Sequence, residues 1–238
     1  MTFEAIIEEL NQLANPEKIA YKEAKSGIIA NNPLGVYQKD LKAIAKRCGK
    51  KSPENNKLAL ALFETGIYEC RLLCSKIFDP KQVTEELMEK WVVTFENWAV
   101  CDSFCMSFLG ASPLALNKIT EWTQREEEFQ KRAGFTLMVG YCFANKNAPN
   151  NRIESFLPII ENAVNDNRIY VKKAVNWALR SIGKRNVDLQ IKAIETAENI
   201  LRNNSKSAQW IAKDALKELQ AEKVSILDYP RSIYRPKQ

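Results

Sequence analysis

The sequence predicts an all-α fold built from stacked, antiparallel helix pairs. Three observations lead to this prediction: apolar residues recur at helical spacing, strand-like alternation is nearly absent, and glycine or proline repeatedly interrupts the apolar stripes. The stretches between the interruptions are about 10 to 18 residues long, which predicts about twelve to fourteen short helices. The interruptions fall at Pro16, Pro33, Gly49, Pro53, Gly66, Pro80, Gly110, Pro113, Pro149 and Gly183.

Individual segments support these helices in chain order. A stripe that contains Leu58 and Leu62 follows Pro53, and a second stripe runs from Val83 to Phe95. Thr84 is the expected N-cap of this second helix, because two glutamates follow it and acidic residues favour the first turn of a helix.

Three segments share one pattern of cations. In residues 171–183 and 205–219, a cation stands four residues before a tryptophan and another stands three residues after it. Residues 39–49 repeat the pattern around an alanine, and the two tryptophan segments are 33 residues apart, a typical helical-repeat period. The cations of the pattern are Lys39, Lys46, Lys173, Arg180, Lys206 and Lys213.

Stacked helix pairs with such a period predict a HEAT-like α-solenoid, a right-handed superhelix whose inner helices line a concave surface. If the six cations and Arg132 point into that surface, they form a basic groove for duplex DNA, which would be bound through its phosphates and independently of sequence. The alternative is a set of solvated lysine faces, and the periodicity alone does not separate the two. We expect residues 1–221 to form a single domain and residues 222–238 an extended C-terminal tail.

Composition excludes several classes of chemistry. The 35 basic residues exceed the 29 acidic ones by six, and there is no histidine. Catalysis by a Ser-His-Asp or Cys-His pair, by a histidine base or by a His-ligated metal is therefore impossible. No glycine-rich phosphate loop occurs. We expect no cofactor and no metal, so any catalysis must use carboxylates, Lys, Arg, Tyr, Cys or aromatic faces.

The six cysteines are expected to be small core residues in a reducing compartment. Cys70/Cys74 and Cys101/Cys105 could each place two thiols on one helix face, as a zinc site would, but no CxxC motif is present. The first residues are acidic and no apolar run approaches the roughly 18 residues of a membrane span. We therefore expect a cytoplasmic protein without a membrane partner.

Four residues are candidates for chemistry. Trp98 and Asp102 are four apart and so share a helix face, and an aspartate in this apolar, thiol-rich stretch is unusual because a buried carboxylate is costly without partners. By itself Asp102 could instead be structural and cap the helix that begins near residue 99. Arg132 precedes two small residues where backbones can pack tightly, and Trp177 lies among cations, although a core anchor is the commoner role of such a tryptophan.

The segments FENWAVCD, REEEFQKRAGF, VKKAVNWALRSIGKRN and SKSAQWIAKDAL, together with NPLGVYQKDLKAIAK, resemble the AlkD family of HEAT-like DNA glycosylases from about residue 31 to residue 219. By that resemblance, Trp98, Asp102, Arg132 and Trp177 match the active-site residues of the family. The resemblance implies a monofunctional, metal-independent glycosylase that removes cationic N3- or N7-alkylated purines from duplex DNA while the base stays in the helix. Asp102 would stabilise positive charge on the sugar, the tryptophans would add cation–π contacts, and Arg132 would hold a phosphate.

Two departures from the family pattern occur. Ala99 stands where family members commonly have an acid, and the N-terminal aromatic-Pro-aromatic-Leu-Gly segment is represented only by Asn31-Asn32-Pro33-Leu34-Gly35. One rival is therefore a non-enzymatic AlkD-like protein that binds bent or branched DNA. Another is a HEAT-type scaffold for an acidic protein partner. We expect the protein to be a monomer.

Overall fold

The computed structural model of the chain describes residues 1–49 and 51–231, and within these residues it contains helices and no strand. The predicted all-α class is confirmed. The α-helices in chain order are α1 (Phe3–Gln12), α2 (Pro16–Ser26), α3 (Gln38–Arg47), α4 (Pro53–Glu64), α5 (Tyr68–Ile77), α6 (Glu85–Val92), α7 (Trp98–Ser107), α8 (Ala115–Trp122), α9 (Glu128–Ala144), α10 (Asn150–Glu154), α11 (Leu157–Ala163), α12 (Ile169–Gly183), α13 (Val187–Leu201) and α14 (Lys206–Leu219). Two 3-10 turns, η1 (Pro80–Gln82) and η2 (Leu109–Ala111), flank α6 and α7.

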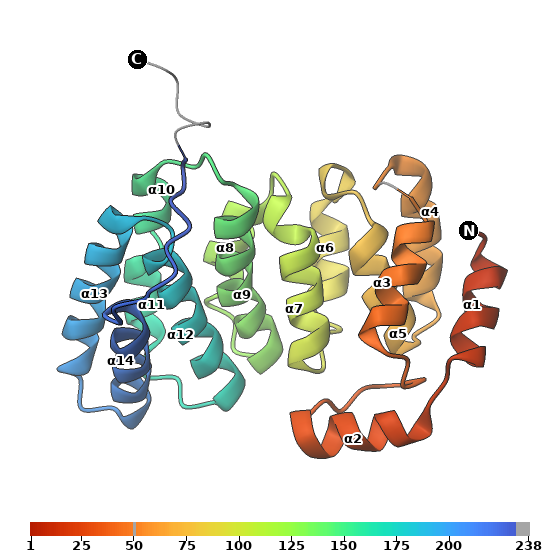
Figure 1. Cartoon of the computed structure of the whole chain (residues 1–238), viewed down its shortest axis with the longest axis horizontal. Helices are drawn as coiled ribbons and strands as arrows, with labels where there is room; N and C mark the ends of the chain where they lie inside the picture. The colour runs from red at the N-terminus through yellow and green to blue at the C-terminus, as the bar shows by residue number, and fades with distance from the viewer. Residues whose placement is uncertain (50, 232–238) are drawn as a thin grey trace. The chain divides into compact units, whose positions relative to one another are not determined.

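The helices form two compact units (Figure 1). Unit 1 comprises Met1–Pro113 with α1 to α7, and unit 2 begins at Leu114 and contains α8 to α14. The single domain over residues 1–221 stays a prediction. In the described part of the chain, no helix combines the length and the apolar character that crossing a bilayer requires.

An aromatic cluster forms the core of unit 1. The indole of Trp91 is fully buried, and its centroid lies 5.1 to 6.1 Å from the rings of four phenylalanines. These are Phe63, Phe78, Phe104 and Phe108. Cys70, Cys74, Cys101 and Cys105 are buried around α5 and α7, so their expected role as core residues is confirmed.

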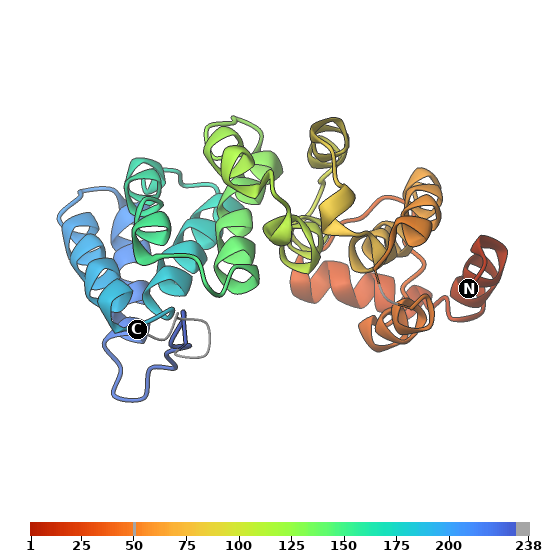
Figure 2. The ribbon, with the colours of Figure 1, turned by 90° about the horizontal axis from the view of Figure 1, so that it is seen from above.

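Helix α2 packs differently from its neighbours in unit 1, because none of its side chains is buried. It lies across the lower ends of α3 and α5 in Figure 1, and in Figure 2 it is seen from the side whereas α4 and α6 are seen nearly end-on. Asn15 caps its start, and Gly27 ends it in the left-handed conformation. The Asn15 backbone N–H donates to the Leu34 carbonyl at 2.8 Å, so the start of α2 rests on the segment before α3.

Unit 2 is organised around α9 and α12, which pack against each other, with α8 beside α9 and with α13 and α14 beside α12. Small residues permit these close approaches. A Cβ added to Gly134 of α9 would lie 2.5 Å from the backbone nitrogen of Thr123, and one added to Gly183 would lie 2.7 Å from the Leu219 side chain. The tight packing predicted at Gly134 is therefore present.

The segment after α14 returns along the end of α12 (Figure 1). Residues 222–231 form neither helix nor strand, and Leu227 and Tyr229 donate backbone hydrogen bonds to the carbonyls of Lys184 and Arg185, each at 2.8 Å. Arg185 is fully buried and donates to the Cys142 carbonyl of α9 and to three carbonyls of the loop between α9 and α10. Residues 232–238 of the predicted tail lie outside the described residues.

Candidate active site and nucleic-acid interface

Helix α7 positions the two predicted site residues that belong to unit 1. The side-chain oxygen of Asn97 accepts hydrogen bonds from the backbone N–H groups of Ala99 and Val100, each at 3.0 Å. Trp98 is the first residue of α7, and Asp102 lies one turn later. The alternative in which Asp102 caps this helix is wrong, because Asn97 occupies the N-cap position.

The residues around the start of α7 are anchored to other parts of unit 1. Buried Arg71 donates from Nη1 to both carboxylate oxygens of Glu96, at 2.8 and 2.6 Å, and from Nη2 to the Thr94 carbonyl at 2.7 Å. Asn97 also donates from Nδ2 to the Ile29 carbonyl at 2.9 Å. Charge-assisted bonds of this kind are among the stronger ones in proteins, so the segment that presents the first tryptophan is held in place.

The indole of Trp98 is held as well. Its Nε1 donates to the carbonyl of Ser26, the last residue of α2, at 2.9 Å. The ring is half-buried, which leaves part of it accessible. This bond restricts rotation of the ring and joins α2 to α7.

Trp98 and Asp102 line one pocket of unit 1, with a volume of about 380 Å³. Helices α2, α3, α5 and α7 all contribute to its wall. The lining residues are Lys22, Ile28, Gln38, Tyr68, Lys76, Trp98, Ala99, Asp102, Ser103, Met106 and Ser107. The structure therefore brings the predicted tryptophan and aspartate together in one cavity.

The pocket wall also contains two lysines that the sequence patterns did not identify. Lys22 donates from Nζ to the Val36 carbonyl at 3.2 Å and lies 3.8 Å from the fully buried carboxylate of Glu69. Burial lowers the pKa of Lys22, and the nearby Glu69 charge opposes that shift. The pKa of Lys76 is lowered by burial and by the Lys42 charge. The pocket thus combines one carboxylate with two basic groups.

Arg132 of α9 lies in unit 2 and is buried. Its Nη1 donates to the Tyr170 carbonyl at 2.7 Å, while the Tyr170 N–H donates to the Glu128 carboxylate at 3.2 Å. These bonds join the beginning of α9 to the beginning of α12. The phosphate contact of Arg132 stays a prediction.

Helix α12 presents Trp177, which is half-buried, and Arg180, one turn later. Arg180 donates from Nε to the Asn176 side chain at 2.8 Å and from Nη1 to Glu218 of α14. Lys184 donates to the same Glu218 carboxylate at 2.5 Å, and both cations lower the pKa of that carboxyl. The charge of Arg180 is therefore partly neutralised within unit 2.

The other predicted DNA-contacting residues have exposed side chains. In unit 1, Lys39 and Lys46 are exposed on α3, and in unit 2 the exposed lysines lie on α12 and α14, which pack against each other. Those of unit 2 are Lys173, Lys206 and Lys213. All five are therefore accessible to a large ligand.

Residues 6–219 match the family described as DNA alkylation repair enzyme. The chain belongs to this family. The match includes all four residues that the AlkD-like motifs single out, and the resemblance on which they were chosen is confirmed.

Two Listeria proteins are similar to this member of the DNA alkylation repair family over most of their length. The uncharacterized protein Lin0241 of Listeria innocua is 26% identical over 201 residues, which cover 84% of this chain and 87% of the relative. Lmo0209 of Listeria monocytogenes is 24% identical over the same share of both chains.

A solved structure supports the fold. It is described as "a new family of proteins related to the HEAT-like repeat DNA glycosylases with affinity for branched DNA structures", and it aligns with a TM-score of 0.74 and 23% identity. The alignment covers 95% of this chain and 97% of the other. The fold of this DNA alkylation repair family member is therefore HEAT-like.

Proposed function

We propose that the protein is a DNA glycosylase that hydrolyses the N-glycosidic bond of cationic N3- or N7-alkylated purines in duplex DNA. Membership of the DNA alkylation repair family supports the substrate class. Alkylation at these nitrogens gives the purine a positive charge, so the base leaves without a general acid. As the bond breaks, positive charge develops on the deoxyribose, and the enzyme must stabilise that charge.

The observation that carries the proposal is the shared pocket of Trp98 and Asp102. The Asp102 carboxylate supplies negative charge opposite the developing sugar cation and can orient the attacking water. The Trp98 face adds a cation–π contact, and the bond to Ser26 keeps that face oriented before the substrate arrives. Neither role needs a histidine, which this chain lacks.

Unit 2 contributes the remaining roles. There the family resemblance assigns Trp177 the role of the second tryptophan and Arg132 a contact to a backbone phosphate. The exposed lysines Lys39, Lys46, Lys173, Lys206 and Lys213 bind further phosphates. Because phosphates are the same in every sequence, we expect binding to be sequence-independent.

The test is release of N7-methylguanine from a duplex that carries one such base, measured with enzyme in excess. The same duplex with unmodified guanine is the substrate control. Release from the methylated duplex alone is the expected result. Absence of release, with the protein folded and bound to the duplex, would overturn the proposal.

A second candidate function is non-enzymatic binding of branched DNA. The similar solved structure is described as belonging to proteins with affinity for branched DNA, and Ala99 stands where glycosylases of the family commonly have an acid. A four-way junction bound much more tightly than a linear duplex, with no base release from either, would favour this function.

A further inference from the structure

Two exposed tyrosines lie close together in unit 1, outside the lining of the Asp102 pocket. Tyr21 belongs to α2 and is 54% exposed, and Tyr37 directly precedes α3 and is 42% exposed. The side chain of Tyr37 makes no capping hydrogen bond to α3. Neither ring is therefore needed to complete the core.

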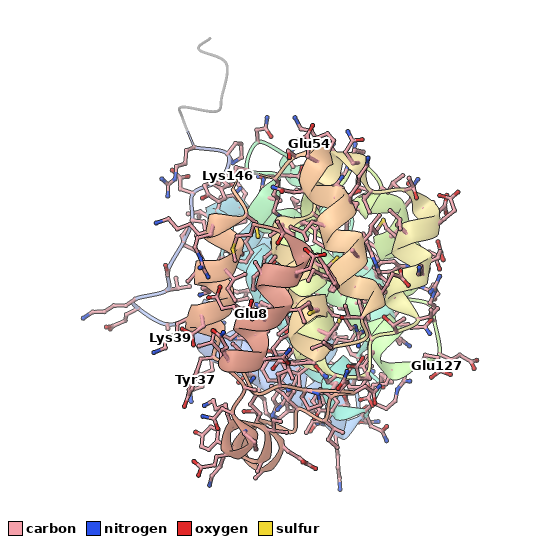
Figure 3. All side chains as sticks on the ribbon, turned by 90° about the vertical axis from the view of Figure 1, so that its right-hand side faces the viewer. Glu8, Tyr37, Lys39, Glu54, Glu127 and Lys146 are labelled. Carbon is pink, nitrogen blue, oxygen red and sulfur yellow. The ribbon has the colours of Figure 1, made fainter. Side chains whose placement is uncertain are left out.

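Lysines surround these rings. The Lys18 ammonium lies 4.3 Å from the centroid of Tyr21 and 5.0 Å from that of Tyr37, and so connects the two. Lys39 approaches Tyr37 at 5.7 Å, and Figure 3 shows these two residues beside each other at the edge of the protein. Cation–π contacts at these distances favour defined ring orientations. We call Lys18, Tyr21, Tyr37 and Lys39 the tyrosine–lysine surface.

Charge is concentrated around this surface. Residues 16–47 contain seven basic and three acidic residues, a net charge of +4, whereas the whole chain carries +6. The stretch of chain that contains both tyrosines is therefore basic. Such a stretch attracts a polyanion.

The backbone beneath the surface holds the two tyrosines at a fixed spacing. Gly35 has a φ of +81°, and a Cβ there would lie 2.1 Å from the Asn15 carbonyl oxygen, so the two backbones are in direct contact. Buried Glu69 accepts from the Leu34 and Gly35 N–H groups, at 2.8 and 2.9 Å, while Lys22 of α2 donates to the Val36 carbonyl. The segment before α3 and helix α2 are thus locked together.

We propose that the tyrosine–lysine surface binds unpaired DNA bases, which stack on Tyr21 and Tyr37 while the lysines contact the neighbouring phosphates. Aromatic platforms interleaved with cations are suited to single strands, because every base has a flat face and every linkage a negative charge. Bases inside an intact duplex are already stacked on one another and offer no face to the tyrosines. An acidic peptide would satisfy the lysines but would leave the rings unused.

This inference requires DNA as the ligand but does not require base excision. Its test is the dissociation constant of the full chain for single-stranded oligothymidylate of about 20 nucleotides, compared with a blunt duplex at the same salt concentration. Tyr21→Ala and Tyr37→Ala should each weaken oligothymidylate binding about tenfold, the usual loss for one stacked base. Duplex binding should change less than twofold.

Matched variants separate stacking from other effects. Tyr21→Phe and Tyr37→Phe keep the ring and should bind like the wild type. Phe143→Ala removes an aromatic side chain that is 39% exposed in unit 2 and should leave both affinities unchanged. Circular dichroism melting of each variant shows whether the fold is retained.

Three outcomes would overturn the inference. They are unchanged oligothymidylate affinity in both alanine variants, an equal loss for single strands and duplex, and polyglutamate that competes as well as oligothymidylate. The Asp102→Asn variant should bind oligothymidylate normally. Failure of the glycosylase assay would therefore leave this test intact.

Discussion

Trp98 and Ser26 are joined by a hydrogen bond in which the indole Nε1 donates to the backbone carbonyl at 2.9 Å. The bond connects the first residue of α7 to the last residue of α2, which are far apart in sequence. Asn97 makes a second connection to the same region through the Ile29 carbonyl. These two hydrogen bonds therefore help to fix the position of α2, which forms one wall of the pocket.

Replacing Trp98 by Phe keeps an aromatic face but removes the bond to Ser26. We expect release of N7-methylguanine to fall about two- to tenfold, because one net hydrogen bond that orients the ring is lost. Single-turnover release is the measurement, and Trp210→Phe in unit 2 is the control. A Trp98→Phe variant with the wild-type rate would show that the bond has no part in orienting the ring.

Replacing Asp102 by Asn preserves the shape of the side chain and removes its charge. We expect release of N7-methylguanine to fall about 10²- to 10³-fold, the usual loss for one electrostatic stabiliser. Duplex affinity should be retained or rise slightly, because a carboxylate near phosphates repels them. The exposed Glu86→Gln is the charge-matched control. If the variant melts several degrees lower and its activity follows only the folded fraction, Asp102 is structural.

Duplex affinity should fall as the salt concentration rises. Each lysine that contacts a phosphate should contribute to the slope of log K against log salt. Lys173→Ala and Lys206→Ala should each reduce the slope of log K against log salt by about 0.9, the value for one phosphate contact. Arg180→Ala should reduce it less, because Glu218 already pairs with that guanidinium. Equal reductions for all three variants would contradict the partial neutralisation of Arg180.

Gly35→Ala should destabilise unit 1 more than Gly66→Ala does. Both glycines have a positive φ, but an added Cβ at Gly35 meets the Asn15 carbonyl oxygen at 2.1 Å, whereas at Gly66 nothing lies within 4 Å. Gly66→Ala should cost about 1 kcal/mol of unfolding free energy from backbone strain alone, and Gly35→Ala about 2 kcal/mol or more. Urea denaturation measures the unfolding free energy of both variants. Equal losses would mean that Asn15 and α2 shift away from residue 35 without an energetic penalty.

Lys51 should make the unfolding free energy depend on alkaline pH. Burial lowers its pKa to about 8, while its Nζ donates to the Ser107 carbonyl at 2.7 Å. In the unfolded chain the lysine pKa returns to about 10.4, so between the two values the unfolded state binds more protons and stability rises with pH. Below pH 8 both states are protonated and Lys51 contributes no slope. Lys51→Met should therefore show a shallower rise between pH 8 and 10, measured by urea denaturation, and an unchanged rise would contradict this assignment.

Several features were predictable because their causes lie within a few residues. Thr84 caps α6 as predicted, accepting from the Leu87 N–H, since capping needs only the hydroxyl and the following turn. Trp98 and Asp102 share a helix face because residues four apart always do so. The family motifs located the same two residues, and the close approach at Gly134 follows from the absence of a side chain there.

The sequence by itself therefore determined the helical class, the family and the pair of residues on α7. Only the tertiary structure placed Lys22 and Lys76 in the same pocket as Asp102, because they come from α2 and α5 and no local pattern records which distant helices will pack together. The same holds for Arg132, whose bond to Tyr170 depends on the packing of α9 against α12, and for Lys18, which reaches two tyrosines on different segments. Helical periodicity depends on residues that are close in sequence. The surroundings of a charged side chain depend instead on which distant helices pack against it when the chain folds.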